Sequence, residues 1–446
     1  MRSALPTFNE VWQQQLRAGV LGQVQHYPAE TQFLIGCSGG MDSMLLLHLM
    51  LVLVPQRIRV IYVNHQLQAP STQWGEFVQR ICQSYNVPCV VQAVDVTAGN
   101  LEQQAREARY SAYQQHCQVN EVLVLAHHEQ DQAETLLLRL LSGAGVQGLA
   151  AMKIHDTREN LRLWRPLLNI SRTQIETWTK QLQLEWIEDP TNQDTHYDRA
   201  WCRQQLWPIL ESRFPKMQKS IGRTAQLMQD TVEILDEVLC VDWEQCIQHN
   251  ALDIQKWREL SKPRQRQLIS SWMKGEGMYR PALHMVDRLV NEVIDARVDA
   301  QAVLHCQDYY YVRYQQRIYR LSVDEYHPTS PQASSVFQLE PEKELVVNPC
   351  SYRWVQAAWG LDASLIGKIL NLQTRQGGEK IHLHGRVGHW PLKKAIQAAQ
   401  IFPWQRQMIQ ILSIDDVMLG VFTPQGFWLA QSEYTCKDGW FPQVIL

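Results

Sequence analysis

A short run of small and polar residues, Ser38-Gly39-Gly40-Met41-Asp42-Ser43, has the side chains expected of a phosphate-binding loop. Its glycines let the backbone curve around an anion, and the free N–H groups at the start of a following helix would point toward it. Ser38 and Ser43 add hydroxyl donors, and Asp42 adds a carboxylate that could hold a magnesium ion between phosphates. The ending of a Walker A loop is absent, which disfavours a kinase or GTPase. An ordinary strand–turn–helix junction is the alternative.

Two carboxylates further along the chain could bind an amine. Asp131 and Glu134 are three residues apart, so both lie on one face of a helix, where they could hold a cationic amine and help to remove its proton. Acidic residues in a first helical turn also complement the helix dipole, which is the alternative explanation. His127 and His128 directly precede the pair, and we expect packing or loop hydrogen bonds from them rather than metal ligation.

Two arginines have the spacing of a second binding element. Arg106 and Arg109 are also three residues apart, so both guanidinium groups could contact phosphate and stabilise developing negative charge. Ion pairs with Glu102 or Glu107 on the same helix would be the structural alternative.

Alternating strand and helix patterns place these residues after buried strands. Successive β-then-α units favour an α/β fold with a doubly wound parallel sheet, whose ligands sit beyond the carboxyl ends of the strands. The expected strands cover residues 32–37, 57–64, 87–96 and 121–126, and the expected helices cover residues 44–54, 72–86, 101–117 and 131–141.

The pattern changes in the second half of the chain. Apolar residues at helical spacing fill residues 215–294, and a hairpin is expected at 309–314 and 318–323. Four prolines between residues 324 and 349, together with Ser334 and Ser335, are typical of a linker. We therefore expect a catalytic α/β domain (1–214), a mostly helical middle domain ending in a hairpin (215–323), a Pro-rich linker (324–358) and a small mixed C-terminal domain (359–446).

The overall charge conceals a local basic cluster. The 446 residues include 42 Lys+Arg and 45 Asp+Glu, a net charge of −3, which excludes a uniformly basic nucleic-acid binder. Residues 375–406 nevertheless hold six basic side chains and one acidic one, with aromatic residues between them. The cluster could bind RNA phosphates, or it could be a solvated face over a small core. Its candidate RNA contacts are Arg375, Lys393, Lys394 and Arg406, and the interleaved aromatic residues are Trp390, Phe402 and Trp404.

Cysteine usage and hydropathy suggest the compartment. The ten cysteines form no CxxC pair, which argues against zinc ribbons, an iron–sulfur cradle and a secreted disulfide framework. The sequence has no signal-peptide pattern, and its longest apolar stretch, residues 44–54, is too short to span a membrane. We expect a soluble cytoplasmic protein with no membrane partner, and the sequence leaves the oligomeric state, including a homodimer, open.

The Ser38–Ser43 loop resembles the signature of the N-type ATP pyrophosphatases, which cleave ATP between its α and β phosphates and adenylate a substrate oxygen. Later segments resemble the tRNA(Ile)-lysidine synthetase family within that superfamily. They cover residues 101–110, 127–135, 139–149 and 189–203, and in the C-terminal part residues 375–378, 392–394 and 401–406. Between residues 203 and 359 the resemblance consists of little more than helix content.

This resemblance implies an adenine nucleotide α-hydrolase-like fold and a specific ligation. ATP would adenylate the wobble cytidine of the CAU-anticodon isoleucine tRNA, and free lysine would then attack carbon 2, giving lysidine, AMP and pyrophosphate. It also implies ATP and Mg²⁺ as cofactors, lysine held by Asp131 and Glu134, and an ATP-facing arginine at 106 or 109. Arg203 is assigned to tRNA, with a nucleotide contact or a surface ion pair as alternatives.

Some positions depart from the family pattern, and other functions are conceivable. Gln66 and Gln68 stand where glycine and arginine are usual, and Ala200 where asparagine is common. A tRNA thiolase with the same loop would need paired cysteines, and a metabolite synthetase would leave the basic cluster without a purpose. A non-catalytic RNA-binding module would not need the intact Ser38, Asp42 and Ser43 constellation.

Overall fold

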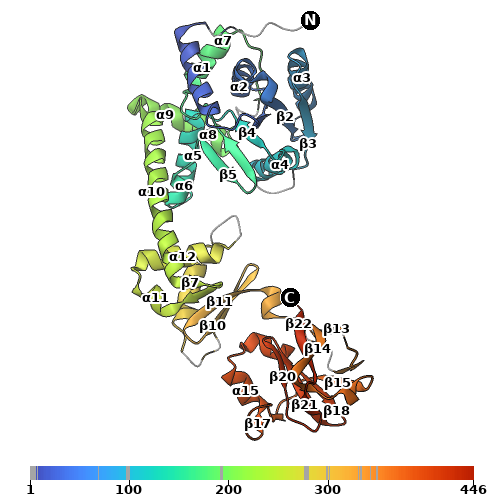
Figure 1. Cartoon of the computed structure of the whole chain (residues 1–446). Helices are drawn as coiled ribbons and strands as arrows, with labels where there is room; N and C mark the ends of the chain where they lie inside the picture. The colour runs from blue at the N-terminus through green and yellow to red at the C-terminus, as the bar shows by residue number, and fades with distance from the viewer. Residues whose placement is uncertain are drawn as a thin grey trace. The chain divides into compact units, whose positions relative to one another are not determined.

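The computed structural model describes residues 7, 9–68, 70–96, 101–190, 194–275, 281–297, 300, 302–329, 331, 334–341, 343–347 and 350–445. The chain divides into two compact units, Met1–Val238 and Leu239–Leu446, and the boundary falls inside the long helix α10 (Met217–Cys246) (Figure 1). The first unit extends past residue 214, the expected end of the catalytic domain, because Trp207 and Met217 form a buried cluster with Ala133.

The first unit is built on a six-stranded sheet in the order β3-β2-β1-β4-β6-β5. All neighbouring strands pair in parallel except β5, which pairs antiparallel with β6. The four expected strands and the doubly wound topology are confirmed, whereas the β5–β6 hairpin was not expected. The strands are β1 (Gln32–Gly36), β2 (Ile58–Asn64), β3 (Cys89–Ala93), β4 (Glu121–Leu125), β5 (His155–Arg158) and β6 (Leu161–Trp164).

Helices cover both faces of this sheet (Figure 1). Successive residues of a strand point to opposite faces, so Phe33 of β1 packs with α1, α2, α3 and α7, while Leu34 packs with Tyr110 and Tyr113 of α4. The helical elements of the unit are α1 (Val11–Val24), α2 (Met41–Leu53), η1 (Pro55–Arg57), α3 (Ser71–Ser84), α4 (Leu101–His116), α5 (Glu129–Leu141), α6 (Val146–Leu149), α7 (Arg172–Gln181), α8 (Asp198–Trp201), the π-helical turn η3 (Cys202–Leu206) and α9 (Trp207–Arg213).

Helix α2 anchors the candidate phosphate loop to the core. Residues 43–51 of this helix are all buried, including the polar Ser43 and His48. A helix that is apolar on nearly every side must be enclosed, so its N-terminus has a fixed position relative to β1. The loop between β1 and α2 is therefore held at both ends.

The second unit begins with helices packed on an antiparallel sheet in the order β7-β8-β11-β10-β9. The expected hairpin is confirmed as β10–β11, but the expectation of helix throughout residues 215–294 is wrong at β7 and β8. These strands form because His249 and Asn250 adopt φ values of 44° and 63°, which close a tight hairpin. The elements are β7 (Ile247–Gln248), β8 (Ala251–Asp253), α11 (Ile254–Glu259), α12 (Lys262–Lys274), α13 (Leu283–Arg288), the π-helical turn η4 (Leu289–Ile294), β9 (Val303–Cys306), β10 (Tyr309–Tyr314), β11 (Arg317–Ser322) and α14 (Val323–Tyr326).

The linker expectation for residues 324–358 is also wrong. Residues 334–338, 344–347 and 350–361 form strands with antiparallel partners. Pro331 precedes the first of these strands and Pro341 lies between the first two. A missing N–H costs no ladder hydrogen bond at either place, so the proline content did not prevent sheet formation. Pro349 lies outside the described residues.

Two larger antiparallel sheets form most of the C-terminal part, in the orders β12-β15-β18-β19-β20 and β13-β14-β21, with β22 also pairing with β14, and β16 and β17 form a small two-stranded sheet. Within the described residues, every helix is too short or too polar to cross a bilayer. The elements are β12 (Ser334–Gln338), β13 (Glu344–Val347), β14 (Cys350–Leu361), η5 (Ala363–Leu365), β15 (Ile369–Thr374), β16 (Lys380–Ile381), β17 (Trp390–Pro391), α15 (Leu392–Ala398), η6 (Pro403–Met408), β18 (Gln410–Ile414), β19 (Val417–Thr423), β20 (Gly426–Leu429), β21 (Thr435–Lys437) and β22 (Trp440–Ile445).

Candidate active site

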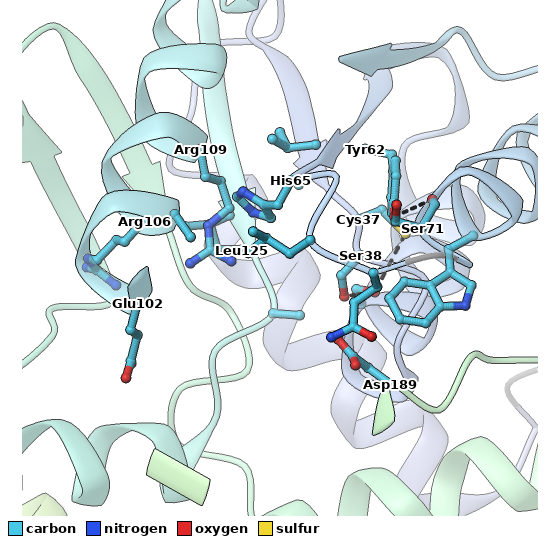
Figure 2. Close-up of a pocket in the computed structure, with 18 of the residues that line it drawn as sticks. Cys37, Ser38, Tyr62, His65, Ser71, Glu102, Arg106, Arg109, Leu125 and Asp189 are labelled. Carbon is cyan, nitrogen blue, oxygen red and sulfur yellow. Dashed lines mark hydrogen bonds between the residues drawn. The ribbon is translucent and has the colours of Figure 1, made fainter. Parts of the chain in front are cut away.

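A cavity of about 490 Å³ opens beyond the carboxyl ends of β1, β2 and β4. Residues that directly follow these strands line it, namely Ser38 after β1, His65 after β2 and His127 after β4. Arg106 and Arg109 project into it from α4, opposite Ser38 (Figure 2). This is the position at which doubly wound sheets bind their ligands. The cavity therefore brings together the predicted loop and the predicted arginines.

The Ser38–Ser43 loop is braced from within. Gly39 has a φ of 82°, and a Cβ atom there would lie 2.7 Å from Ile187 Cδ1, so the position requires glycine. The Ser43 hydroxyl donates to the Gly40 carbonyl at 2.9 Å and lies 3.3 Å from Ser38 Oγ. Ser43 thus stabilises the loop with the proton that the sequence analysis assigned to phosphate. The N–H groups of Met41 and its neighbours, at the start of α2, remain suited to an anion.

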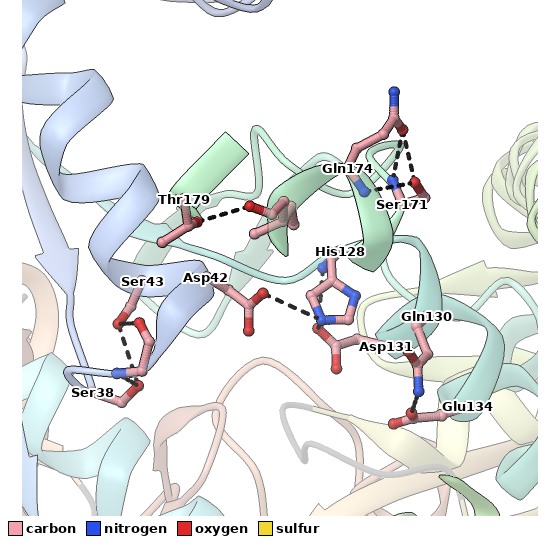
Figure 3. Close-up of polar contacts among 12 residues, drawn as sticks. Ser38, Asp42, Ser43, His128, Gln130, Asp131, Glu134, Ser171, Gln174 and Thr179 are labelled. Atoms are coloured by element: carbon pink, nitrogen blue, oxygen red, sulfur yellow. Dashed lines mark hydrogen bonds and ion pairs between the residues drawn. The ribbon is translucent and has the colours of Figure 1, made fainter. Parts of the chain in front are cut away.

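Asp42 begins a line of polar groups that runs toward α5 (Figure 3). Its Oδ1 atom lies 3.8 Å from His128 Nε2, and the same nitrogen lies 3.5 Å from Asp131 Oδ2. Asp42 Oδ1 is buried and accepts no hydrogen bond from any residue that the structure describes. Burial, reinforced by the negative charge of Asp131, raises the pKa of Asp42. A buried carboxylate oxygen without a donor fits a cation, and Mg²⁺ in nucleotide sites is generally held by one or two carboxylates together with phosphates.

Asp131 and Glu134 do share one helical face, and Arg203 joins them. Arg203 donates to both oxygens of Glu134, from Nε at 2.6 Å and from Nη2 at 2.9 Å, and Nη2 also contacts Asp131 Oδ1 at 3.1 Å. The Glu134 side chain is 0% exposed. Arg203 also lines the cavity, so the acidic pair lies directly behind it. The arginine assigned to tRNA is thus the counter-ion of the predicted lysine-binding acids.

The sequence did not predict the contact of Arg203 with Asp131 and Glu134, because no pattern in the neighbouring residues indicates it. Arg203 lies in the π-helical turn η3, and the wider turn changes the direction in which its side chains leave the helix. Its partners are 69 and 72 residues earlier in the chain. The only available signal was that Arg203 ends the segment, residues 189–203, that resembles the closing part of the family's catalytic domain.

The electrostatics of the cluster leave one negative charge unbalanced. Burial by itself would raise the pKa of Asp131, but His128, Arg203 and the amide N–H of His128 together lower it. Burial by itself would lower the pKa of Arg203, but its hydrogen bonds and charge interactions with Glu134 and Asp131 raise it. Within the trio of Asp131, Glu134 and Arg203, without Asp42 and His128, two carboxylates and one guanidinium sum to −1, a charge that one added ammonium group would balance.

The two predicted arginines carry uncompensated charge. Among the described residues neither Arg106 nor Arg109 has an acidic side chain at ion-pair distance, and Glu102 pairs with Arg199 at 3.2 Å instead. The Arg106 guanidinium lies 5.1 Å from the centre of the Tyr110 ring. Burial, then the charges of the neighbouring arginines, lower its pKa. Free positive charge beside a phosphate loop favours an anionic ligand.

Further residues of the cavity were not assigned to ligand binding from the sequence. His65 and His127 line it, and each has a buried Nδ1 atom without a hydrogen-bond partner among the described residues. Burial lowers the pKa of His65 to about 4 and that of His127 to about 3, so both are neutral at pH 7. Gln66 takes the left-handed conformation expected of glycine, with a φ of 56°, and its N–H donates to Asn64 Oδ1 at 2.9 Å. That turn compensates for the missing glycine.

The predicted RNA contacts of the C-terminal part lie in the second unit. Some of these basic side chains are exposed, and others already bond to neighbouring groups. Lys393 and Lys394 are exposed at the start of α15, whereas Arg375 pairs with Glu379 at 3.4 Å and Arg406 donates to the Ile401 carbonyl at 3.1 Å. Of the interleaved aromatic residues, Phe402 and Trp404 pack on Tyr314 and Tyr319, and Trp390 stays 40% exposed. Thr191 and Asn192, in the segment that ends the catalytic resemblance, lie outside the described residues.

Comparison with known proteins gives matches along the whole chain. Residues 13–210 match the PP-loop domain family, residues 252–319 the TilS substrate binding domain and residues 370–438 the TilS substrate C-terminal domain. The tRNA(Ile)-lysidine synthase of Acinetobacter baylyi is 56% identical over 447 residues, covering 100% of this chain and 97% of that protein. The tRNA(Ile)-lysidine synthase of Alkalilimnicola ehrlichii is 35% identical over 388 residues, covering 85% and 86%.

Proposed function

This chain belongs to the tRNA(Ile)-lysidine synthase family, and we propose that its first unit performs both half-reactions of lysidine formation in the cavity beyond β1, β2 and β4. The reaction is the ATP-dependent ligation of lysine to the wobble cytidine of isoleucine tRNA. The observation that carries the assignment of the site is that one cavity joins the Ser38–Ser43 loop, two unpaired arginines and Arg203, behind which the acidic pair lies.

The first half-reaction makes a poor leaving group into a good one. The oxygen on carbon 2 of cytidine attacks the α-phosphorus of ATP, a new P–O bond forms, and the bond to the β-phosphate breaks. The Ser38–Ser43 loop and the N-terminus of α2 bind the phosphates through N–H groups, and Arg106 and Arg109 stabilise the charge that develops on them. Asp42 would hold Mg²⁺, which would neutralise charge on the departing pyrophosphate.

The second half-reaction uses the net charge of −1 at the acidic cluster. The lysine ε-ammonium group binds beside Arg203, with Asp131 as its main partner, because Glu134 is already held at both oxygens by Arg203. After loss of a proton, the amine attacks carbon 2 of cytidine, and the C–O bond to AMP breaks. A neighbouring carboxylate that accepts the proton and the desolvation of the amine on binding both assist the loss of the proton.

The remaining assignments follow from the substrates. We infer that the tRNA carries the CAU anticodon, that Lys393 and Lys394 contact its phosphates, and that the enzyme works in the cytoplasm, where ATP, free lysine and tRNA are present together. A homodimer stays a prediction. The thiolase alternative is disfavoured because Cys37, the cysteine beside the loop, is buried and burial raises its pKa to about 11, so it is a poor nucleophile.

The decisive experiment separates the two half-reactions. Wild-type protein, ATP, labelled lysine and a CAU-anticodon isoleucine tRNA transcript should give covalent label on the RNA and release pyrophosphate. Asp131→Asn should lose lysine transfer at least tenfold more than it loses adenylation, measured as pyrophosphate release before lysine is added.

Glu129→Gln is the matched control, because Glu129 also lies in the first turn of α5 and is equally placed to complement the helix dipole. It should leave both half-reactions nearly unchanged. Equal losses of adenylation and transfer in Asp131→Asn would contradict the lysine assignment, and absence of label with wild type would contradict the proposed reaction.

A further inference from the structure

The second unit contains a separate cavity of about 430 Å³ that the proposed reaction does not use. Its walls come from segments far apart in the sequence, which β14, β20, β22 and the loop after β16 bring together. The side chains that define it are Trp359, His384, Trp428 and Phe441 on the walls and Ala398 and Ala399 at the end of α15.

The aromatic wall of this cavity is partly exposed to solvent. Trp359 is 41% exposed, its ring lies 4.5 Å from that of His384 at an angle of 40°, and Lys437 Nζ lies 5.8 Å from the ring centre. His384 is fixed in turn, because its Nδ1 lies 2.8 Å from Gln431 Oε1. A large indole held open to water beside a fixed ring offers a platform on which a flat ligand can stack.

Small side chains keep the floor of the cavity open. Ala395 and Ala398 of α15 and Ala399, which caps that helix, all line it, at the spacing that places residues on one helical face. Lys394 lies one helical turn before Ala398 on that face and is exposed. Arg386 also lines the cavity. The cavity thus combines an apolar floor, an aromatic wall and a cationic rim.

A nucleobase with its flanking phosphates has the matching chemistry, because bases stack on aromatic side chains while the backbone meets basic groups. We propose that this cavity binds one unpaired nucleobase of the tRNA, stacked on Trp359, with the adjoining phosphates near Arg386 and Lys437. The inference rests on the proposed function only in taking tRNA as the substrate. The base comes either from the single-stranded 3′ end of the tRNA or from one of its loops.

A cavity-filling variant tests the proposal without changing charge. Ala398→Leu adds bulk at an exposed helical position inside the cavity, and Gln397→Leu adds a leucine to the next exposed position of α15, outside the residues that line it. The dissociation constant of a tRNA transcript is measured for both at several salt concentrations. Ala398→Leu should weaken binding about five- to one-hundredfold, the range found for loss of one stacked base, and Gln397→Leu should bind as wild type does.

Two outcomes would overturn the proposal. They are wild-type affinity in both Ala398→Leu and Trp359→Leu, and an equal loss of affinity in Gln397→Leu. A transcript trimmed of its single-stranded 3′ end identifies the source: if the base comes from that end, trimming and Ala398→Leu weaken binding without adding to each other, and if it comes from a loop the two losses add.

The outcome is independent of the chemistry in the first unit. Covalent labelling of tRNA by lysine at saturating tRNA tests the proposed reaction, whereas the dissociation constant tests the cavity. Ala398→Leu should therefore reach wild-type labelling once tRNA is saturating. A loss of labelling at saturating tRNA in this variant would contradict a role confined to binding.

Discussion

Replacing Arg203 with methionine would remove the only guanidinium that bonds both acids of α5 in the described structure, while keeping an unbranched side chain of similar length. Three charge-assisted hydrogen bonds would be lost, two to Glu134 and one to Asp131. The fully buried Glu134 carboxylate would keep only its bond from Gln130 Nε2, at 3.0 Å.

The cost follows from this burial. Removing one partner of a buried ion pair costs about 3–5 kcal/mol, because an uncompensated charge stays behind in the interior. The Arg203 side chain is 22% exposed, so water would reach part of the vacated space, and we expect about 3 kcal/mol. Glu134→Gln in the same chain removes the stranded charge, so the double variant should be about 1–2 kcal/mol more stable than Arg203→Met alone.

Hydrogen exchange of α5 amides is the suitable assay. It reports the free energy of opening of that helix and does not require a chain of two units to unfold in one transition. Arg199→Met is the matched control, because Arg199 lies one helical turn before Arg203 and pairs with the partly exposed Glu102. Loss of such a pair should cost less than about 1 kcal/mol.

The reasoning would be refuted if Arg203→Met cost no more than Arg199→Met, or if adding Glu134→Gln recovered nothing. Either result would mean that Arg203 does not compensate the acidic pair in solution. Lysine affinity gives a second readout. Without Arg203, Asp131 and Glu134 leave two negative charges uncompensated, so the KM of Arg203→Met for lysine should differ from that of wild type. Its rate of adenylation should stay within a few-fold of the wild-type rate.

Three other changes test separate parts of the molecule. Asp42→Asn should abolish pyrophosphate release and leave the circular dichroism spectrum unchanged, because its carboxylate stabilises a bound cation rather than the fold; normal turnover would exclude that role. Lys393→Ala with Lys394→Ala should weaken tRNA binding and reduce the salt slope by about 1–2, and an unchanged slope would mean a solvated face. His127 has a pKa of about 3 in the folded chain against 6.5 when unfolded, so the unfolded chain binds more protons between these values and stability falls as pH falls. Between pH 7 and pH 5 the free energy of unfolding should fall because of His127, and His127→Gln should make that fall smaller by up to about 2 kcal/mol, measured by urea unfolding at each pH. An unaltered pH dependence would show that His127 stays accessible to protons in the folded chain.

The sequence by itself determined the features that depend on neighbours along the chain. Residues 38–43 predicted a phosphate loop because glycine and serine at the junction of a strand and a helix restrict the backbone locally. The four parallel strands were predictable because each is a short, mostly apolar run followed by a helical pattern. The common face of Asp131 and Glu134 needed only the period of the helix.

Local composition failed where pairing with distant residues decides the structure. Pro328 and Pro331 made residues 324–358 look like a linker, yet strand formation there depends on partners such as residues 369–374 and 440–445. Likewise, Phe402 and Trp404 were candidates for contact with RNA by their place in the basic cluster, but both side chains pack against Tyr314 and Tyr319.

Only the tertiary structure decided which side chains of the site contact one another. Arg203 meets Asp131 and Glu134 across 69 to 72 residues of chain, through a π-helical turn that has no sequence signature. The second cavity likewise exists only because Trp359 and Phe441 lie on paired strands beside α15. Spacing along a chain fixes which side chains share a face, because that depends on the period of one element. Which faces meet depends on how the elements pack together, and that is where the charge balance of the acidic cluster and the shape of the second cavity arise.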